Sequence, residues 1–195
     1  MAVILKNLLL NRIKPLGKLS QEEEEAFLGI LSEESIGKGD LIFRPGKMAN
    51  KMYFLLKGGL RSYYIKNGEE ITDYFFFEES FATDYVSYFG DKPTEFYLEA
   101  LEDTLAITYD RAEICKVAEN YPRFQKFLRI HSEMAFIEIE QRMRILQNET
   151  LETKFQYTLS QFPYLFQRVP QHQIASYLGV KPESLSRIKQ KKTTG

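Results

Sequence analysis

The stretch QHQIASYLGVKPESLSRIKQ, residues 171–190, has the pattern of a helix-turn-helix. A first helix is expected to end at Leu178, Gly179 suits the turn, and a second helix is expected to open at Pro182. The apolar positions are spaced to close a small core between the two helices: Ile174, Leu178, Val180, Leu185 and Ile188. The segment therefore predicts two short helices joined by a tight turn.

The second of these helices carries side chains that suit a DNA groove. Glu183 can accept a hydrogen bond from a cytosine amino group, and Arg187 can pair with a guanine edge through two bonds. Ser184 and the lysines can bond phosphates. We expect DNA contacts from seven residues: Gln171, Lys181, Glu183, Ser184, Arg187, Lys189 and Lys191. An ordinary helical hairpin is the structural alternative.

The distribution of charge favours a C-terminal segment that binds a polyanion. The chain has 195 residues with a net charge of -1, but residues 151–195 hold 7 basic and 2 acidic side chains, a net of +5. Residues 1–150 hold 19 basic and 25 acidic side chains, a net of -6. Such a basic end beside an acidic remainder is typical of nucleic-acid binding, although a solvated helix face would give the same count.

Composition limits the other possibilities. A chain of 195 residues with 44% hydrophobic residues is long and apolar enough for one large or two small folded domains. Cys115 is the only cysteine, which excludes an internal disulfide framework and fits a reducing cytoplasm. Residues 2–10 indicate an amphipathic helix rather than a signal peptide, and nothing reaches the roughly 20 apolar residues of a membrane span.

Glycine-rich turns and short apolar runs before residue 110 predict an antiparallel barrel or jelly roll over residues 35–110. Gly58-Gly59 and Asn67-Gly68 each separate two runs rich in β-branched and aromatic residues, as tight hairpin turns do. Two further strands are expected at 96–101 and 105–109. Ser20 and Glu23 have the spacing of a capping box, so a short helix is expected before the barrel.

A long helix should follow the barrel. Residues 123–147 contain no Gly or Pro, and Phe127, Ile130, Met134 and Ile137 recur at spacings of three and four. A second apolar flank could meet a partner helix, or the helix could pack only on its own barrel. Together these parts predict an α+β fold.

Three parts of the chain, in this order, resemble the Crp/Fnr family of transcription regulators: the barrel with its two hairpins, the helix from Pro122 to Gln147, and the segment RVPQHQIASYLGVKPESLSRIKQKK. The resemblance implies a cyclic-nucleotide-binding-like sensor domain over 1–121, a dimerisation helix over 122–148 and a winged helix-turn-helix over 149–195. Residues 166–169 would lie near the wing, Glu183 and Arg187 would read bases, Ser184 would contact a phosphate, and RNA polymerase would be a partner. The family's cyclic-AMP-dependent activator has arginine where this chain has Pro182, so one base contact is missing.

Members of that family that bind cyclic nucleotides use a Gly-Glu pair and, about ten residues later, an Arg-Ser pair. Here Thr83-Asp84 and Thr94-Glu95 stand at those positions, so the phosphate would face a carboxylate and no arginine. Cyclic AMP is therefore not expected. An effector pocket for another small molecule would involve Phe81, Thr83, Asp84, Thr94, Glu95, Ala135 and Ile139. Aromatic residues around it fit a barrel core equally well.

The remaining function classes find little support. An iron–sulfur sensor needs several cysteines, and this chain has one. The only histidines, His131 and His172, fall outside the predicted barrel, so a barrel metalloenzyme is not expected. Neither catalytic activity nor a cofactor is expected. His131 alone leaves haem ligation open. The sequence favours a cytoplasmic, dimeric transcription regulator that binds a roughly palindromic site on double-stranded DNA; the alternative is a signalling or scaffolding protein whose C-terminal domain contacts only proteins.

Overall fold

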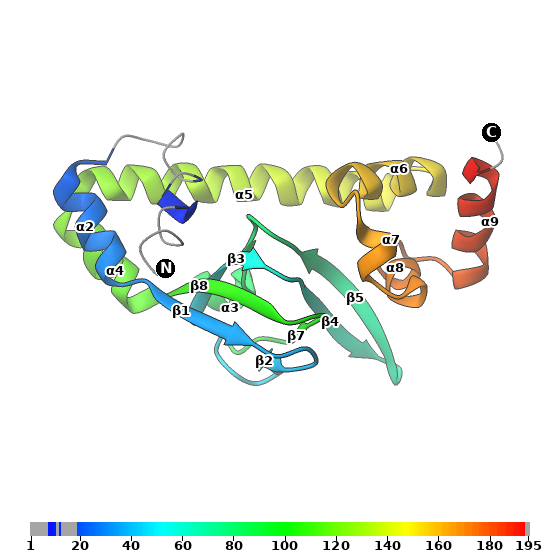
Figure 1. Ribbon diagram of the computed structural model, residues 1–195, viewed down its shortest axis with the longest axis horizontal. Helices are drawn as coiled ribbons and strands as arrows, with labels where there is room; N and C mark the ends of the chain where they lie inside the picture. The colour runs from blue at the N-terminus through cyan, green and yellow to red at the C-terminus, as the bar shows by residue number, and fades with distance from the viewer. Residues whose placement is uncertain (1–7, 11, 13–18, 194–195) are drawn as a thin grey trace. The chain divides into compact units, whose positions relative to one another are not determined.

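The computed structural model describes residues 8–10, 12 and 19–193 (Figure 1), with side chains described as far as Gln190. The chain divides into two compact units, the first made of Met1–Ser62 and Phe75–Glu133, and the second of Tyr63–Tyr74 and Met134–Gly195. Of the N-terminal helix expected over 2–10, residues 8–10 are helical and the rest lie outside the described residues.

Two four-stranded sheets form the barrel that the sequence predicts. One has the strand order β1-β8-β3-β6 and the other β2-β7-β4-β5. The pairs β1/β8, β3/β8, β3/β6 and β2/β7 are antiparallel. Strand neighbours that are distant in sequence are typical of a jelly roll. The strands are β1 (Ser32–Ile36), β2 (Leu41–Phe43), β3 (Lys51–Lys57), β4 (Leu60–Lys66), β5 (Glu69–Phe76), β6 (Phe81–Ala82), β7 (Tyr97–Ala100) and β8 (Thr104–Asp110).

The hairpin turns follow from their residues. Asn67 and Gly68 have φ of 54° and 81°, the positive pair that a type I′ turn between β4 and β5 requires. Gly58, with φ of 94°, lies so close to β8 that an added Cβ would stand 2.4 Å from the Thr104 hydroxyl. The hairpin predicted at Asn67-Gly68 is confirmed. The hairpin predicted at Gly58-Gly59 is wrong, because the strands that this turn joins, β3 and β4, belong to different sheets. Any side chain at Gly58 would clash with the neighbouring strand β8.

Helices close one side of the first unit around an aromatic core. They are α2 (Gln21–Gly29), α3 (Tyr85–Gly90), α4 (Arg111–Asn120) and the start of α5 (Pro122–Asn148). The predicted capping box of Ser20 and Glu23 begins α2. Phe27 on α2 is buried against Tyr109 of β8, with ring centroids 5.9 Å apart, and against Phe124 of α5, at 5.3 Å. These rings join the helices to the sheet through apolar contact.

The second unit is helical apart from the end of the β4–β5 hairpin. It holds the distal part of α5, then α6 (Leu151–Gln161), α7 (Leu165–Arg168), α8 (Gln171–Tyr177) and α9 (Pro182–Thr193). Its core includes Phe155, Leu165, Ile174, Leu178 and Leu185, all nearly inaccessible to solvent. The long helix and both helices of the predicted helix-turn-helix are confirmed.

One part of the expectation is corrected. The segment 166–169, which the family resemblance placed near a wing, lies at the end of α7 and beyond it, and the described residues after Asp110 contain no strand. Residues 162–170 separate α6 from α8, and Leu165–Arg168 among them form α7. Pro163 and Pro170 have no backbone N–H to donate to a strand neighbour. The helix-turn-helix is present, but the described residues hold no β-wing.

Candidate nucleic-acid interface and effector region

The turn between α8 and α9 is built by a left-handed glycine. Gly179 has φ of 68°, and its N–H donates to the Ser176 carbonyl at 3.0 Å. The next N–H, of Val180, reaches back to the Ala175 carbonyl, also at 3.0 Å. This pair of bonds is the Schellman ending of a helix, which turns the chain sharply while satisfying the last carbonyls. The sequence GVKP therefore ends α8 and starts α9 three residues later.

The faces of α9 are divided as a recognition helix requires. Leu185 is completely buried and Ile188 half-buried, so this side of α9 packs on the core of the second unit. Glu183 and Arg187, four residues apart and hence on one face, are exposed. Lys181 is exposed at the start of the helix, and Ser184 is half-buried. Both predicted base readers are therefore accessible to a ligand.

Two of the predicted DNA contacts also hold the fold together. The Gln171 side-chain amide donates to the Pro182 carbonyl at 3.3 Å, which ties the start of α8 to the first turn of α9. The Lys189 ammonium lies 4.8 Å from the centroid of the Phe166 ring, a cation–π contact that limits its reach. The side chain of Lys191 lies outside the described part of the chain.

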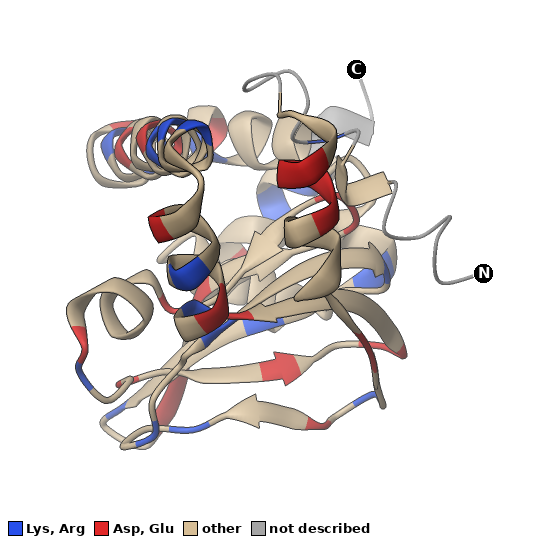
Figure 2. Cartoon of the chain, turned by 90° about the vertical axis from the view of Figure 1, so that its left-hand side faces the viewer, with Lys and Arg blue, Asp and Glu red and all other residues tan. Residues whose placement is uncertain are grey.

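Acidic and basic side chains of α5 pair with one another along the helix. Exposed ion pairs Arg129–Glu133 and Arg144–Glu140 follow the i, i+4 spacing of one helix. Figure 2 shows acidic and basic residues close together along α5. The excess of basic charge in residues 151–195 therefore belongs to the segments after this helix, and α9 carries Arg187 and Lys189 on exposed positions.

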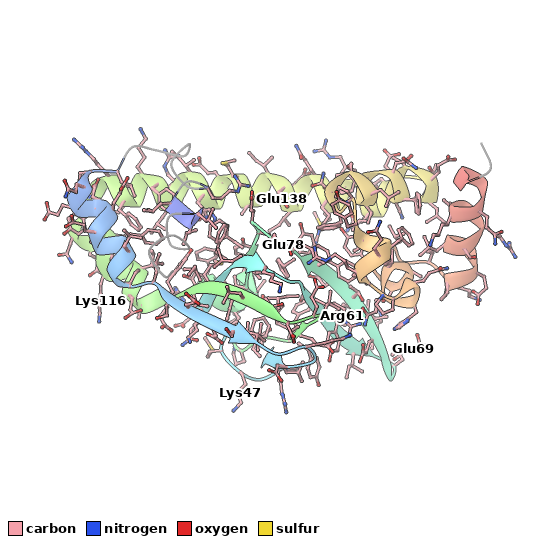
Figure 3. All side chains as sticks on the ribbon, viewed as in Figure 1. Lys47, Arg61, Glu69, Glu78, Lys116 and Glu138 are labelled. Carbon is pink, nitrogen blue, oxygen red and sulfur yellow. The ribbon has the colours of Figure 1, made fainter. Side chains whose placement is uncertain are left out.

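Sequence reasoning missed a group of contacts between the β4–β5 hairpin and the helices of the second unit. The Thr72 N–H on β5 donates to the Ser176 hydroxyl of α8 at 2.9 Å. Two residues along, the Tyr74 hydroxyl donates to Glu138 of α5 at 2.9 Å, and Figure 3 labels Glu138 on that helix. The Tyr74 ring packs edge-on against Phe162 at 5.9 Å. Because these partners are 64 to 104 residues apart in the chain, no local sequence signal announces them.

The two tyrosines of this region remain protonated. Burial, reinforced by Glu138, raises the pKa of Tyr74 far above its ordinary value. Burial likewise raises the pKa of Tyr177, whose ring centroid is 6.4 Å from that of Tyr74. Each phenol therefore keeps its proton at physiological pH, and Tyr74 acts as the donor toward the Glu138 carboxylate.

Four of the residues predicted for an effector pocket have structural partners in the first unit. The Asp84 carboxylate caps α3, accepting from the N–H groups of Val86 and Ser87. The Thr83 hydroxyl donates to the Lys51 carbonyl at 2.9 Å. Thr94 is only 2% exposed, and its hydroxyl accepts from the Phe96 N–H. The ring of Phe81 packs against that of Phe54 at a tilt, with centroids 5.0 Å apart.

The remaining pocket candidates are Glu95, Ala135 and Ile139. Glu95 is exposed beside Thr94. Ala135 and Ile139 belong to the second unit, where Ala135 is half-buried and Ile139 is exposed. A shallow depression of about 380 Å³ lies elsewhere in the first unit, lined by Ser35, Ile36, Gly37, Lys57, Asp103, Thr104 and Leu105. It includes none of the predicted effector residues.

A half-buried ion pair of the first unit has no counterpart among the predicted features. Arg61 on β4, labelled in Figure 3, is 2% exposed, and its guanidinium is 3.0 Å from the Glu99 carboxylate on β7. The alternation of strand residues would have placed Arg61 on one face of β4, but its opposite charge on β7 could not be matched without knowing that these strands are neighbours.

The described residues give no group of three or more His, Cys, Asp and Glu side chains placed to hold a metal ion. No helix in the same part of the chain combines the length and hydropathy needed to cross a membrane.

Comparison with known proteins agrees with this architecture. Residues 33–121, which span β1 to α4, match the cyclic nucleotide-binding domain model. These residues belong to the cyclic nucleotide-binding domain family. A search of the curated proteins found no match to the sequence.

Solved structures extend the likeness beyond this cyclic nucleotide-binding domain. FixK2 from Bradyrhizobium japonicum is similar with a TM-score of 0.67 and 19% identity, over 85% of each chain. A proposed regulator of the Crp/Fnr family from Eubacterium rectale is similar with a TM-score of 0.66 and 16% identity, over 90% of this chain and 84% of that one. The catabolite activator protein of Thermus thermophilus is similar with a TM-score of 0.55 and 20% identity, over 93% of this chain and 87% of that one. The cyclic nucleotide-binding domain is thus followed by the long helix and C-terminal helices of the Crp/Fnr fold.

Proposed function

We propose that the protein is a DNA-binding transcription regulator of the Crp/Fnr type, with α9 as the helix that reads the major groove. The observation that carries this proposal is the exposure of Glu183 and Arg187 on the face of α9 away from buried Leu185. A carboxylate and a guanidinium one turn apart can read cytosine and guanine edges, while nearby cations bond the backbone. Residues 149–195 would act as the DNA-binding domain and residues 1–121 as the sensor.

Dimerisation through residues 122–148 is supported by the surface of α5. Its distal part exposes large apolar side chains, with Phe136 69% accessible. The others are Met134, Ile137, Ile139 and Met143. A second copy of this helix would remove these side chains from water, which stabilises association. A dimer places two recognition helices about 34 Å apart and favours a roughly palindromic site.

The signal to which the sensor domain responds is proposed to be a small molecule other than cyclic AMP. Thr94 and Glu95 occupy the positions at which a nucleotide-binding member has arginine and serine, and Asp84 is engaged as the cap of α3. A cyclic phosphate would meet a carboxylate instead of a cation. The proposal includes a cytoplasmic location, RNA polymerase as partner and no catalytic activity.

The test is selection of duplexes from a random library with the purified full chain, followed by titration at several salt concentrations. We expect enrichment of a two-part sequence with half-sites one helical turn apart and a steep fall of affinity with ionic strength. Retention of no duplex at low ionic strength would contradict the proposal and favour a scaffold whose C-terminal domain contacts proteins.

A further inference from the structure

The hairpin of β4 and β5 meets the helix-turn-helix through one hydroxyl. β5 is an end strand in its sheet order, so one of its edges has no strand neighbour among the described residues. At that edge the Ser176 hydroxyl accepts from the Thr72 N–H at 2.9 Å and lies 3.2 Å from the Glu70 carbonyl, to which it donates. Residues two apart on a strand present their backbone groups to the same side. One serine therefore takes the place of a pairing strand at two successive groups.

This contact satisfies a backbone N–H that would be costly to leave without a partner. Thr72 is only 4% exposed, so water has little access to its N–H. A hydroxyl has one proton to donate and lone pairs to accept, which is what this N–H and carbonyl together require. An alanine or valine at position 176 could hydrogen-bond neither the Thr72 N–H nor the Glu70 carbonyl. A buried backbone donor without a partner destabilises its surroundings.

A second set of contacts fixes the same strand to other helices. Asp73 accepts from Arg142 of α5, whose guanidinium also lies 4.4 Å from the Tyr74 ring centroid. Tyr74 in turn packs against Phe162 and Tyr177. The recognition residues Glu183 and Arg187 take no part in these contacts and are exposed. The hairpin therefore holds α8 without covering the face of α9 proposed to meet DNA.

We propose that Ser176 is a positioning residue for DNA recognition, which fixes α8 to the edge of β5 so that displacement of the β4–β5 hairpin is passed to α9. The inference rests on the proposed function for its consequence in DNA binding. The two hydrogen bonds of the Ser176 hydroxyl to β5, here called the latch, involve only residues of the second unit. Because α8 and α9 are joined by the short turn at Gly179, a change in the seating of α8 alters the angle at which α9 is presented.

The latch is tested by hydrogen exchange on the full chain without DNA. In Ser176→Ala we expect the Thr72 amide to exchange about tenfold faster or more, and Ser176→Thr to restore its protection. Ser160→Ala is the matched control, because that hydroxyl donates only to Tyr157 within α6. An unchanged Thr72 rate in Ser176→Ala overturns the proposal, as does equal acceleration of all second-unit amides, which would signal unfolding.

Transmission is tested by a double-mutant cycle. Gly68→Ala strains the hairpin turn, where φ is 81°. We expect it to speed exchange in α8 and α9 when Ser176 is present and to have less effect in Ser176→Ala. Equal effects in both backgrounds would show that the hairpin and α9 are not coupled through this hydroxyl.

DNA binding provides the last arm, with a duplex selected by the wild-type chain as probe. Ser176→Ala should weaken binding to that duplex about tenfold while binding to random duplex stays within about twofold, and Ser176→Thr should recover most of the loss. Equal weakening on both duplexes would refute a positioning role. If the wild type prefers no duplex, the proposed function fails, and the exchange cycle still decides whether the latch exists.

Discussion

The guanidinium of Arg142 lies over the ring of Tyr74, with its central carbon 4.4 Å from the ring centroid. The same side chain donates to the Asp73 carbonyl at 3.3 Å and lies 3.8 Å from the Asp73 carboxylate. A single cation on α5 thus binds both the side chain and the backbone of β5. Since Arg142 is mostly buried, this contact has more energetic weight than the exposed ion pairs of the same helix.

Replacing Arg142 should therefore loosen the second unit. We expect Arg142→Ala to lower the free energy of unfolding by about 1 to 2 kcal/mol, because the cation–π contact and the bonds to Asp73 are lost together. Thermal unfolding followed by circular dichroism measures the change. Arg144→Ala, which removes only an exposed pair with Glu140, should cost about 0.5 kcal/mol or less. Equal losses in the two variants would contradict the role given to Arg142.

Arg187 should contribute to sequence choice. Arg187→Ala is expected to weaken binding to a selected duplex by about 1 to 3 kcal/mol and to relax the preference at one base pair, because a two-bond contact to guanine is removed. Competition titrations with every base at each position measure this. Lys181→Ala is the contrast, since loss of a phosphate contact should weaken selected and random duplexes alike. A uniform loss in Arg187→Ala would show that it contacts only the backbone.

The stability of the first unit should fall in mild acid because of His131. Its ring packs edge-on against Phe81 at 4.5 Å, and burial, helped by the charge of Arg12, lowers its pKa below the ordinary value of 6.5. Below pH 6.5 the unfolded chain therefore binds more protons than the folded chain, so the stability from neutral His131 is present at higher pH and is lost as pH falls from 6.5 toward the folded pKa.

Denaturant titrations between pH 7.5 and pH 5 test this expectation. His131→Phe keeps an aromatic ring beside Phe81 and should flatten that pH dependence, whereas His172→Gln, at an exposed position on α8, should leave it as in the wild type. The same slope in all three proteins would assign the acid sensitivity to other groups.

Phe136 should decide whether α5 associates. Phe136→Glu places a charge within the exposed apolar surface, where a second helix would have to desolvate it, so we expect a monomer at concentrations that give a wild-type dimer. Sedimentation equilibrium measures the mass. Gln141→Glu adds the same charge at another exposed position of α5 and serves as the control. A dimer that persists in Phe136→Glu would place the interface elsewhere.

Gly179 is expected to matter for conformation rather than for space. An added Cβ would meet nothing within 4 Å at Gly179 or at Gly29, but only Gly179 has a positive φ. Gly179→Ala should therefore cost about 1 kcal/mol, while Gly29→Ala should be neutral or stabilising. Unfolding midpoints of the two variants give the comparison. Similar costs would mean that the left-handed backbone at 179 is not what makes glycine necessary.

Features fixed by neighbouring residues could be predicted from the sequence. The turn at Asn67-Gly68, the capping box of Ser20 and the break at Gly179 each depend on a few adjacent residues, and all three are present. The helix α4 is not among the predicted elements, although Ile114, Val117 and Ala118 recur at helical spacing after Asp110. This helix is short and lies between a strand and Pro122, so its apolar positions repeat too few times to give a strong helical pattern.

Features that depend on the assembled fold could not be predicted. Asp84 resembled a ligand-binding carboxylate in sequence, yet it caps a six-residue helix that had not been recognised. The bond between Thr72 and Ser176 joins residues 104 positions apart. The family resemblance implied a wing near residues 166–169, whereas these residues lie at the end of α7 and just beyond it. Exposure of Glu183 and Arg187 agrees with the expected readout, but their contacts with DNA stay a prediction.

Pro182 has a consequence for how a duplex would be held. It brings no N–H to the first turn of α9, and the Ser184 N–H already donates to the Lys181 carbonyl at 3.0 Å. The start of α9 therefore has few rigid main-chain N–H groups that could bind a phosphate, and flexible lysine side chains must make many of the phosphate contacts. Contacts of that kind slide readily from one phosphate to the next, so we expect the protein to scan along DNA quickly and to stop only where base edges match.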